Sequence, residues 1–141
     1  MAHPFPGRQY IDLDLIAFAK TVTATRAQIN AGLAIVAAIP GATITPIAYT
    51  MTCIGAFGAL TDIRISTSDA SPVDIFTVAQ ADLTDGSKHG TVSSTTTLGA
   101  GFAVAGTKGK GINIRKTGST ATTATSATVT LHYKITKDLP N

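Results

Sequence analysis

The 141-residue sequence contains no Glu and no Trp, a single Cys and few charged residues. All eight acidic residues are Asp, which favours turns and helix caps, whereas the missing Glu is a good helix former. Because Cys53 is the only cysteine, no disulfide can form within the chain, which excludes a disulfide-built scaffold. Thr is abundant, and its β-branched side chain suits a pleated sheet. The composition therefore predicts an all-β fold, and the length suits one domain.

Charged residues make up only 13% of the sequence, about half the usual share in globular proteins. Residues 71–141 hold seven basic and four acidic side chains, whereas residues 1–70 hold four of each. This weak basic bias is far from the dense basic surface of a nucleic-acid-binding protein, so no direct nucleic-acid binding is expected. A sparsely charged surface is typical of proteins that cover part of it in an assembly.

A membrane-spanning segment is not predicted. The most apolar stretch, residues 31–60, is interrupted by Pro40, Pro46, several Thr and four Gly, whereas a spanning helix needs about 20 consecutive apolar residues. The first residues also lack the basic start and apolar run of a signal peptide.

Alternation of apolar and polar residues predicts strands along most of the chain. The clearest is the last, where Val129, Leu131, Tyr133 and Ile135 share one face. Further strands are predicted near residues 11–15, 44–54, 60–66, 73–78, 91–98, 102–105 and 112–114. Roughly eight to ten short strands at this spacing predict a single β-sandwich of jelly-roll or Greek-key type over residues 10–141.

Residues 27–39 fit two interpretations. The alternation from Ile29 to Ile39 favours a strand, whereas the Ala and Leu residues favour a helix through residues 27–38. A strand is preferred, with a short helix near residues 24–31 kept open. Pro40-Gly41 then predicts a type II turn, because Pro fixes φ at the first central position and Gly accepts a positive φ at the second.

The N-terminal residues 1–9 are predicted to form an extended arm outside the sandwich. Pro4 and Pro6 favour the polyproline II conformation, which lowers the entropy lost when an extended segment docks. Phe5 supplies an apolar anchor and Arg8 a charged contact. Phe5 and Arg8 are therefore predicted partner-binding residues, and the arm is predicted to be an assembly element.

The residues that usually carry catalysis do not form a recognisable motif. His3, His89 and His132 have no second His or Cys at metal-ligand spacing, so each is predicted to be a solvated or interface histidine. The sequence contains no Gly-x-Ser-x-Gly nucleophile elbow, and Cys53 is predicted to be a buried, inert thiol. No catalytic residue, metal or cofactor is predicted, and the chain is not expected to be an enzyme.

Two groups of Asp residues could supply ligands to a cation. Asp12 and Asp14 share one face of a predicted strand, where they are expected to face solvent. Asp62, Asp69 and Asp74 supply oxygens of the kind that calcium prefers, but their spacing matches no calcium-loop pattern.

A glycine-lysine segment, residues 106–111, resembles a phosphate-binding loop in part. Val104 stands where a Walker loop needs its first Gly, and Gly111 stands where it needs Ser or Thr. A flexible hairpin is predicted instead. The segment and the strand after it supply four cations that are predicted to form a basic cluster for an acidic partner surface: Lys108, Lys110, Arg115 and Lys116.

Several features follow one another over residues 35–136. Pro40-Gly41 precedes a predicted strand, and Gly55 and Gly58 interrupt the strand region that leads to an Asp-rich loop. A Thr/Gly/Ala turn then precedes a closing strand that ends in Tyr133-x-Ile135. This layout resembles that of small β-sandwich structural proteins of tailed bacteriophage virions. The resemblance carries over no catalytic residue.

The resemblance implies a virion structural protein, first of all a capsid decoration (cement) protein that stabilises a phage head by protein–protein contacts. It further implies a homo-oligomer, by family analogy a trimer, bound to the major capsid protein or another virion protein. Such a protein is located in the virion, after assembly in the host cytoplasm. The alternative is a tail-fibre or receptor/carbohydrate-binding module, which the absence of Trp and the 6% aromatic content disfavour.

Overall fold

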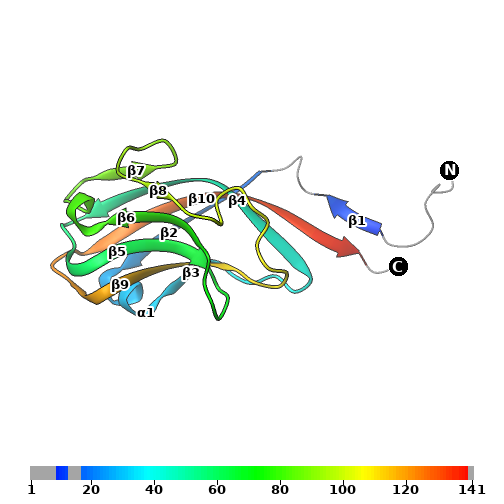
Figure 1. Ribbon diagram of the computed structural model, residues 1–141, viewed down its shortest axis with the longest axis horizontal. Coiled ribbons are helices and arrows are strands. Elements are labelled where there is room, and N and C mark those ends of the chain that lie inside the picture. The colour runs from blue at the N-terminus through cyan, green and yellow to red at the C-terminus, as the bar shows by residue number, and fades with distance from the viewer. Residues whose placement is uncertain (1–8, 13–16, 140–141) are drawn as a thin grey trace.

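The computed structural model describes residues 9–12 and 17–139, and it has an all-β architecture (Figure 1). The strands are β1 (Gln9–Asp12), β2 (Phe18–Thr25), β3 (Leu33–Val36), β4 (Ala42–Ile54), β5 (Gly58–Thr67), β6 (Asp74–Ala79), β7 (Lys88–Gly90), β8 (Thr97–Leu98), β9 (Ile112–Thr122) and β10 (Ser126–Leu139). Two short helical segments accompany them, the α-helix α1 (Arg26–Ala31) and the 3-10 turn η1 (Gln80–Asp82). Neither is long and apolar enough to cross a membrane.

The strands form two antiparallel sheets packed face to face. The first has the order β1-β10-β4-β7, with β2 also paired to β10, and the second has the order β3-β9-β5-β6-β8. Among the described strands, only the neighbours β5 and β6 are consecutive in the chain, so the chain crosses repeatedly between the sheets. In a β-meander, consecutive strands are hydrogen-bonded neighbours, whereas here most connections pass from one sheet of the sandwich to the other. The prediction of an all-β sandwich is confirmed.

The core lies between the two sheets and is filled from alternate residues of each strand. On β10, Val129 and Leu131 are buried, and they lie opposite Met51 and Tyr49 of β4. The predicted inward face of the closing strand is therefore confirmed. A register shift between His132 and Tyr133 leaves an extra residue on β4, so that Ile44 and Pro46 also face inward.

The first and last strands extend the first sheet beyond the sandwich as a two-stranded ribbon (Figure 1). In this ribbon Gln9 pairs with Leu139, and Asp12 pairs with Thr136. Gln9 of the predicted arm thus belongs to β1. The rest of the arm, including Phe5 and Arg8, lies outside the described residues.

The helix at residues 26–31 corrects the preferred prediction of a strand from residue 29 onward. Thr25 caps the helix by accepting a hydrogen bond from the Gln28 amide, and the Gln28 side chain accepts one from the Thr25 amide. Ile29 of the helix is buried, and Gly32, with a φ of 83°, ends it before β3. The alternative prediction of a short helix near residues 24–31 is therefore confirmed. The Pro40-Gly41 turn is confirmed, with φ of 74° at Gly41 and a hydrogen bond from the Ala42 amide to the Ile39 carbonyl.

Strand prediction was wrong in the Gly-rich stretch. Residues 91–96 and 102–105 form loops, and only Thr97–Leu98 form a strand, β8. The chain between them lies close to β6, where the amides of Gly99 and Gly101 donate hydrogen bonds to the carbonyls of Ile75 and Asp74. A Cβ on Gly99 would collide with the Asp74 backbone, which explains the glycine there. Conversely, β2 and β7 were not predicted, and β9 continues to Thr122, into the segment that was predicted as a Thr/Gly/Ala turn before the closing strand.

Candidate functional site

The outer face of the first sheet carries rows of threonines from three neighbouring strands. Thr130 of β10 lies between Thr21 of β2 and Thr50 of β4, and Thr128 lies between Thr23 and Thr52 in the next row. The hydroxyls of Thr21 and Thr130 are 2.8 Å apart, and those of Thr23 and Thr128 are 2.9 Å apart. We call these six residues the threonine face.

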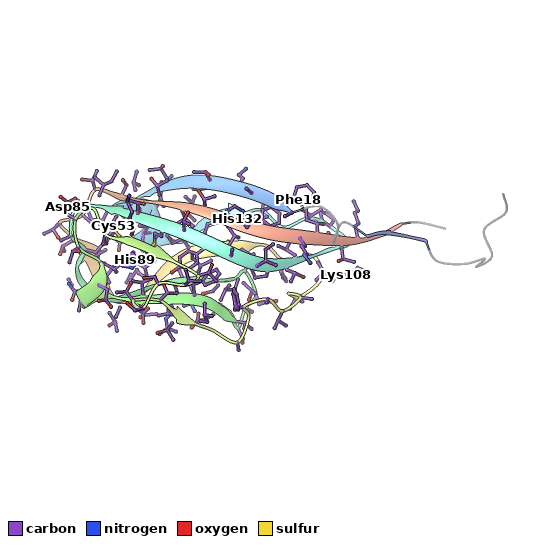
Figure 2. The ribbon with its side chains drawn as sticks, turned by 90° about the horizontal axis from the view of Figure 1, so that it is seen from above. Phe18, Cys53, Asp85, His89, Lys108 and His132 are labelled. Atoms are coloured by element: carbon purple, nitrogen blue, oxygen red, sulfur yellow. The ribbon has the colours of Figure 1, made fainter. Side chains whose placement is uncertain are left out.

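The threonine face carries no charge, and four of its hydroxyls are hydrogen-bonded to one another in pairs. The next row, towards the ribbon, consists of Ala19, His132 and Ala48. Figure 2 shows His132 on this sheet, and its predicted outward orientation is confirmed. Paired hydroxyls and methyl groups lose little hydration energy when another protein covers them. The face thus suits packing against a second protein surface.

The outer face of the second sheet carries a closed Arg–Asp network. Arg64 donates to both carboxylate oxygens of Asp62, at 2.8 and 2.9 Å, and to Asp74 at 2.6 Å. Arg115 donates to Asp74 at 2.8 Å and to Ser66 at 3.0 Å. These bonds join β5, β6 and β9, so the network ties three neighbouring strands together on their outer side.

Electrostatics within this network favour the charged forms. Burial alone would raise the pKa of Asp62, but hydrogen bonds from Arg64 and Thr117 outweigh it and hold that pKa below its usual range. The hydrogen bond to Asp62 raises the pKa of Arg64. The alternative of a calcium site at Asp62, Asp69 and Asp74 finds no support, since Asp62 and Asp74 hold arginines. In the part of the chain that the structure describes, no group of three or more His, Cys or Asp is arranged to hold a metal ion.

His89 corrects the prediction of a solvated or interface histidine in a loop. It lies on β7 with only 3% of its surface exposed, and its two ring nitrogens bind hydroxyls: Nε2 binds Ser87 at 2.9 Å and Nδ1 binds Thr95 at 2.8 Å. Burial lowers the pKa of His89, and the nearby Asp82 opposes this shift. These bonds tie the loop after β7 to the sheet.

A serine hydroxyl next to an imidazole is also the arrangement of a hydrolase nucleophile and its base. Here the second ring nitrogen meets the hydroxyl of Thr95 in place of the carboxylate that orients a catalytic histidine. Cys53 lies close by (Figure 2), and burial raises the pKa of its thiol, which keeps it protonated and inert. The buried cysteine predicted from the sequence is confirmed. The geometry accordingly supports a structural role for this cluster.

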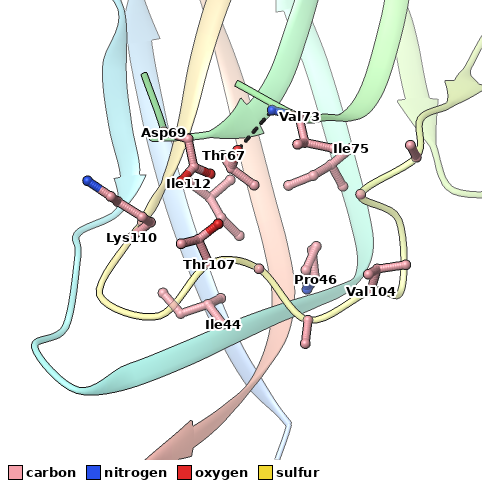
Figure 3. Close-up of a pocket in the computed structure, with 15 residues that line it drawn as sticks. Ile44, Pro46, Thr67, Asp69, Val73, Ile75, Val104, Thr107, Lys110 and Ile112 are labelled. Carbon is pink, nitrogen blue, oxygen red and sulfur yellow. Dashed lines mark hydrogen bonds between the residues drawn. The ribbon is translucent and has the colours of Figure 1, made fainter. Parts of the chain in front are cut away.

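A small pocket of about 120 Å³ lies between the sheets at the end nearest the ribbon (Figure 3). Its walls are mostly apolar and come from both sheets and from the loop before β9: Ile44, Pro46, Val73, Ile75, Val104 and Ile112. Val104 and Val73 are 53% and 42% exposed, so two apolar side chains of the lining also reach the surface. We call this site the apolar pocket.

The loop that covers the apolar pocket is fixed to the edge of β4. The amides of Ala103, Gly106 and Gly109 donate to the carbonyls of Pro46, Ile44 and Ala42, at 2.9, 3.0 and 2.8 Å. These bonds satisfy an edge that β7 leaves unpaired. The predicted hairpin at residues 106–111 is therefore a strap along β4.

One polar group in the wall of the apolar pocket has no partner among the described residues. The Oδ2 atom of Asp69 is buried and accepts no hydrogen bond. Lys110 also lines the pocket, but its ammonium group points away from the interior (Figure 3). A buried carboxylate oxygen without a donor is costly. The pocket thus combines apolar walls with one unsatisfied acceptor.

The structure does not bring the four predicted cations into one patch. Arg115 belongs to the Arg–Asp network, whereas Lys116 follows it on β9 and therefore points to the other face, where it donates to the Gly118 carbonyl at 2.7 Å. Lys108 and Lys110 lie in the strap along β4. Partner binding by these four residues stays a prediction. The network was not predicted from the sequence, although the alternation of Asp62, Arg64 and Ser66 with Ile63 and Ile65 places its β5 members on one face.

A comparison with solved structures finds a similarity that extends over nearly the whole chain. The chain is similar to a chain of the cyanophage Pam1 capsid asymmetric unit, with 16% identity over 99% of this chain and 93% of that chain, at a TM-score of 0.43. At this TM-score the similarity assigns neither fold nor function. No family model and no curated protein matches the sequence.

Proposed function

We propose that this protein is a virion structural protein, and more specifically a decoration (cement) protein that stabilises a phage head by protein–protein contacts. The observation that carries the proposal is the character of the two outer sheet faces. One is the uncharged threonine face, and the other holds its charges in the Arg–Asp network. A protein that covers the six threonines or the Arg–Asp network leaves no unpaired charge among those residues.

Assembly on a symmetric shell multiplies modest contacts of this kind. Each copy contributes limited energy, but the repeated arrangement holds many copies in place at once. The proposed role needs no chemical step, so we propose that the chain is not an enzyme. We further propose that the chain forms a homo-oligomer and that its partner is the major capsid protein. By analogy with the phage proteins that the sequence resembles, the proposed oligomer is a trimer.

The experiment is to purify the virus particles that contain this chain and locate it by labelled antibody in electron microscopy. We expect label over the head, at a regular stoichiometry by mass spectrometry. Particles made without the chain should form but release their genome at a lower temperature. Absence of the chain from purified particles would refute a virion role. Label over the tail alone would favour the tail-fibre alternative.

Binding to sugars by a tail fibre is disfavoured by the positions of the aromatic rings. Tyr49, Phe57, Phe76 and Tyr133 are buried, and Phe18 and Phe102 are partly buried and packed against the core. None of the aromatic side chains placed by the structure is therefore an exposed platform for stacking. A glycan array tests this alternative directly, and selective binding to one glycan class would support it.

A further inference from the structure

We propose that the apolar pocket receives Phe5 from the N-terminal segment of a second copy of this chain, with Arg8 of that segment bound to Asp69. This inference rests on the proposed function, since it names a contact between copies in the assembly.

The pocket has the size of one large apolar side chain. Its volume of about 120 Å³ is somewhat below the roughly 150 Å³ of an apolar cavity that accepts a benzene ring. The walls formed by Ile44, Ile75 and Ile112 offer contacts to such a ring, and the exposed Val73 and Val104 extend the apolar surface around the opening. A single anchoring residue from an extended segment fits this site.

Because Asp69 Oδ2 lacks a hydrogen-bond partner in the described part of the chain, a ligand of the pocket should carry a hydrogen-bond donor next to its apolar side chain. Asp69 Oδ2 has no hydrogen-bond partner among the described residues, and the Lys110 ammonium beside the pocket points away from it. A guanidinium group satisfies a carboxylate better than a neutral donor does. The ligand that fits is therefore a peptide with an apolar side chain followed closely by a cation.

The residues before β1 supply this pattern within eight positions. Phe5 is their only aromatic residue, it stands between Pro4 and Pro6, and Arg8 follows three positions later. Three residues span about 10 Å when extended, enough to place a ring in the pocket and a guanidinium at its wall. The flanking prolines disfavour helix and keep such a segment extended.

The position of β1 favours a second copy over the same copy. Gln9 lies opposite Leu139 and Ile44 lies opposite Ile135, so the start of β1 is about 14 Å from the pocket wall along β10. Because β1 and β4 flank β10 on opposite sides, about 10 Å across the sheet is added. The combined straight-line separation of about 17 Å already takes up the reach of about 14 Å of backbone from Gln9 back to Phe5 together with the length of the Phe5 side chain. A path around the sheet would be longer still.

Cysteine cross-linking of the full-length chain tests the contact. Gly7→Cys, which leaves Phe5 and Arg8 in place, is combined with Val104→Cys beside the pocket, and the matched control combines Gly7→Cys with Val92→Cys, a fully exposed residue of another loop. Cys53 is buried and stays in place. A mixture of ¹⁵N-labelled and unlabelled chains identifies bonds between copies by mass spectrometry.

We expect disulfide-linked chains with the Val104→Cys pair, and at least about tenfold fewer with the Val92→Cys control. Asp69→Asn and Arg8→Gln should each reduce the linked fraction about tenfold, with no further loss when they are combined. A disulfide within one chain would overturn the assignment to a second copy. Cross-linking no greater than in the control would overturn the contact, and full cross-linking with Asp69→Asn would overturn the pairing with Arg8.

The same variants separate this inference from the proposed function. If the double-cysteine chain enters particles without forming the bond, the contact is wrong while the virion role stands. If the bond forms in solution but the chain is absent from particles, the role is wrong while the contact stands.

Discussion

Asp74 lies between two arginines, and its Oδ2 atom is 2.6 Å from Nη1 of Arg64 on the neighbouring strand β5. Its Oδ1 atom accepts from Arg115 of β9 and from Ser66 of β5. A single carboxylate thus links three strands of the second sheet. The charges of this outer face are paired within the subunit, which leaves few of them for salt-dependent contacts with solvent or partners.

Replacing Asp74 by Ala should lower the free energy of unfolding by about 1–3 kcal/mol, because two guanidinium groups and one hydroxyl lose their acceptor. Thr77→Ala, on the same strand and face, is the control and should change stability by less than about 0.5 kcal/mol. Urea unfolding of both variants measures the difference. Equal effects would show that the network contributes nothing beyond packing.

Stability should decrease as the pH falls below about 6.5 because of His89. Burial lowers the pKa of His89 in the folded protein, so the unfolded chain binds the proton first. The loss begins at the unfolded value and levels off once the pH is below the folded pKa. Unfolding curves between pH 7.5 and 4.5, compared with those of His89→Gln, isolate this contribution. Identical pH profiles for the two proteins would contradict the assignment.

The closing strand should show a large difference between its two faces. Leu131 has none of its surface exposed, and its replacement by Ala should cost about 2–5 kcal/mol. Thr130 lies on the threonine face, where it binds the Thr21 hydroxyl, and its replacement by Ala should cost at most about 1 kcal/mol. Thermal or urea unfolding of the isolated protein tests both. Similar costs would mean that the buried and outer faces of β10 contribute alike.

Two glycines with the same positive φ should respond differently to substitution by Ala. Both Gly118 and Gly109 have φ of 76°, so each variant should lose about 1 kcal/mol from backbone strain. At Gly118 a Cβ would also collide with Thr61, whose amide nitrogen lies 2.8 Å away, whereas at Gly109 nothing lies within 4 Å. Gly118→Ala should therefore cost about 1–3 kcal/mol more than Gly109→Ala. Equal losses would show that β5 moves aside freely.

Local patterns predicted the features that depend on neighbours in the chain. The alternation of Val129, Leu131 and Tyr133 identified the inward face of β10, and Pro40-Gly41 identified a turn, because side-chain direction and φ preference are properties of a few adjacent residues. The same reasoning was insufficient at residues 27–36, where helix and strand patterns overlap. There the capping box at Thr25 and the burial of Ile29 decided for a helix.

The sequence by itself determined an all-β chain with few surface charges and a buried Cys53. Only the tertiary structure decided which distant residues meet: Asp74 binds Arg115, 41 positions away, and a strap of glycines closes a pocket beside Asp69. It also buried His89, which the sequence placed in a loop. The physical reason is that periodicity gives the face on which a side chain lies, whereas strand order and register determine its neighbours on that face. Those depend on the packing of the whole chain.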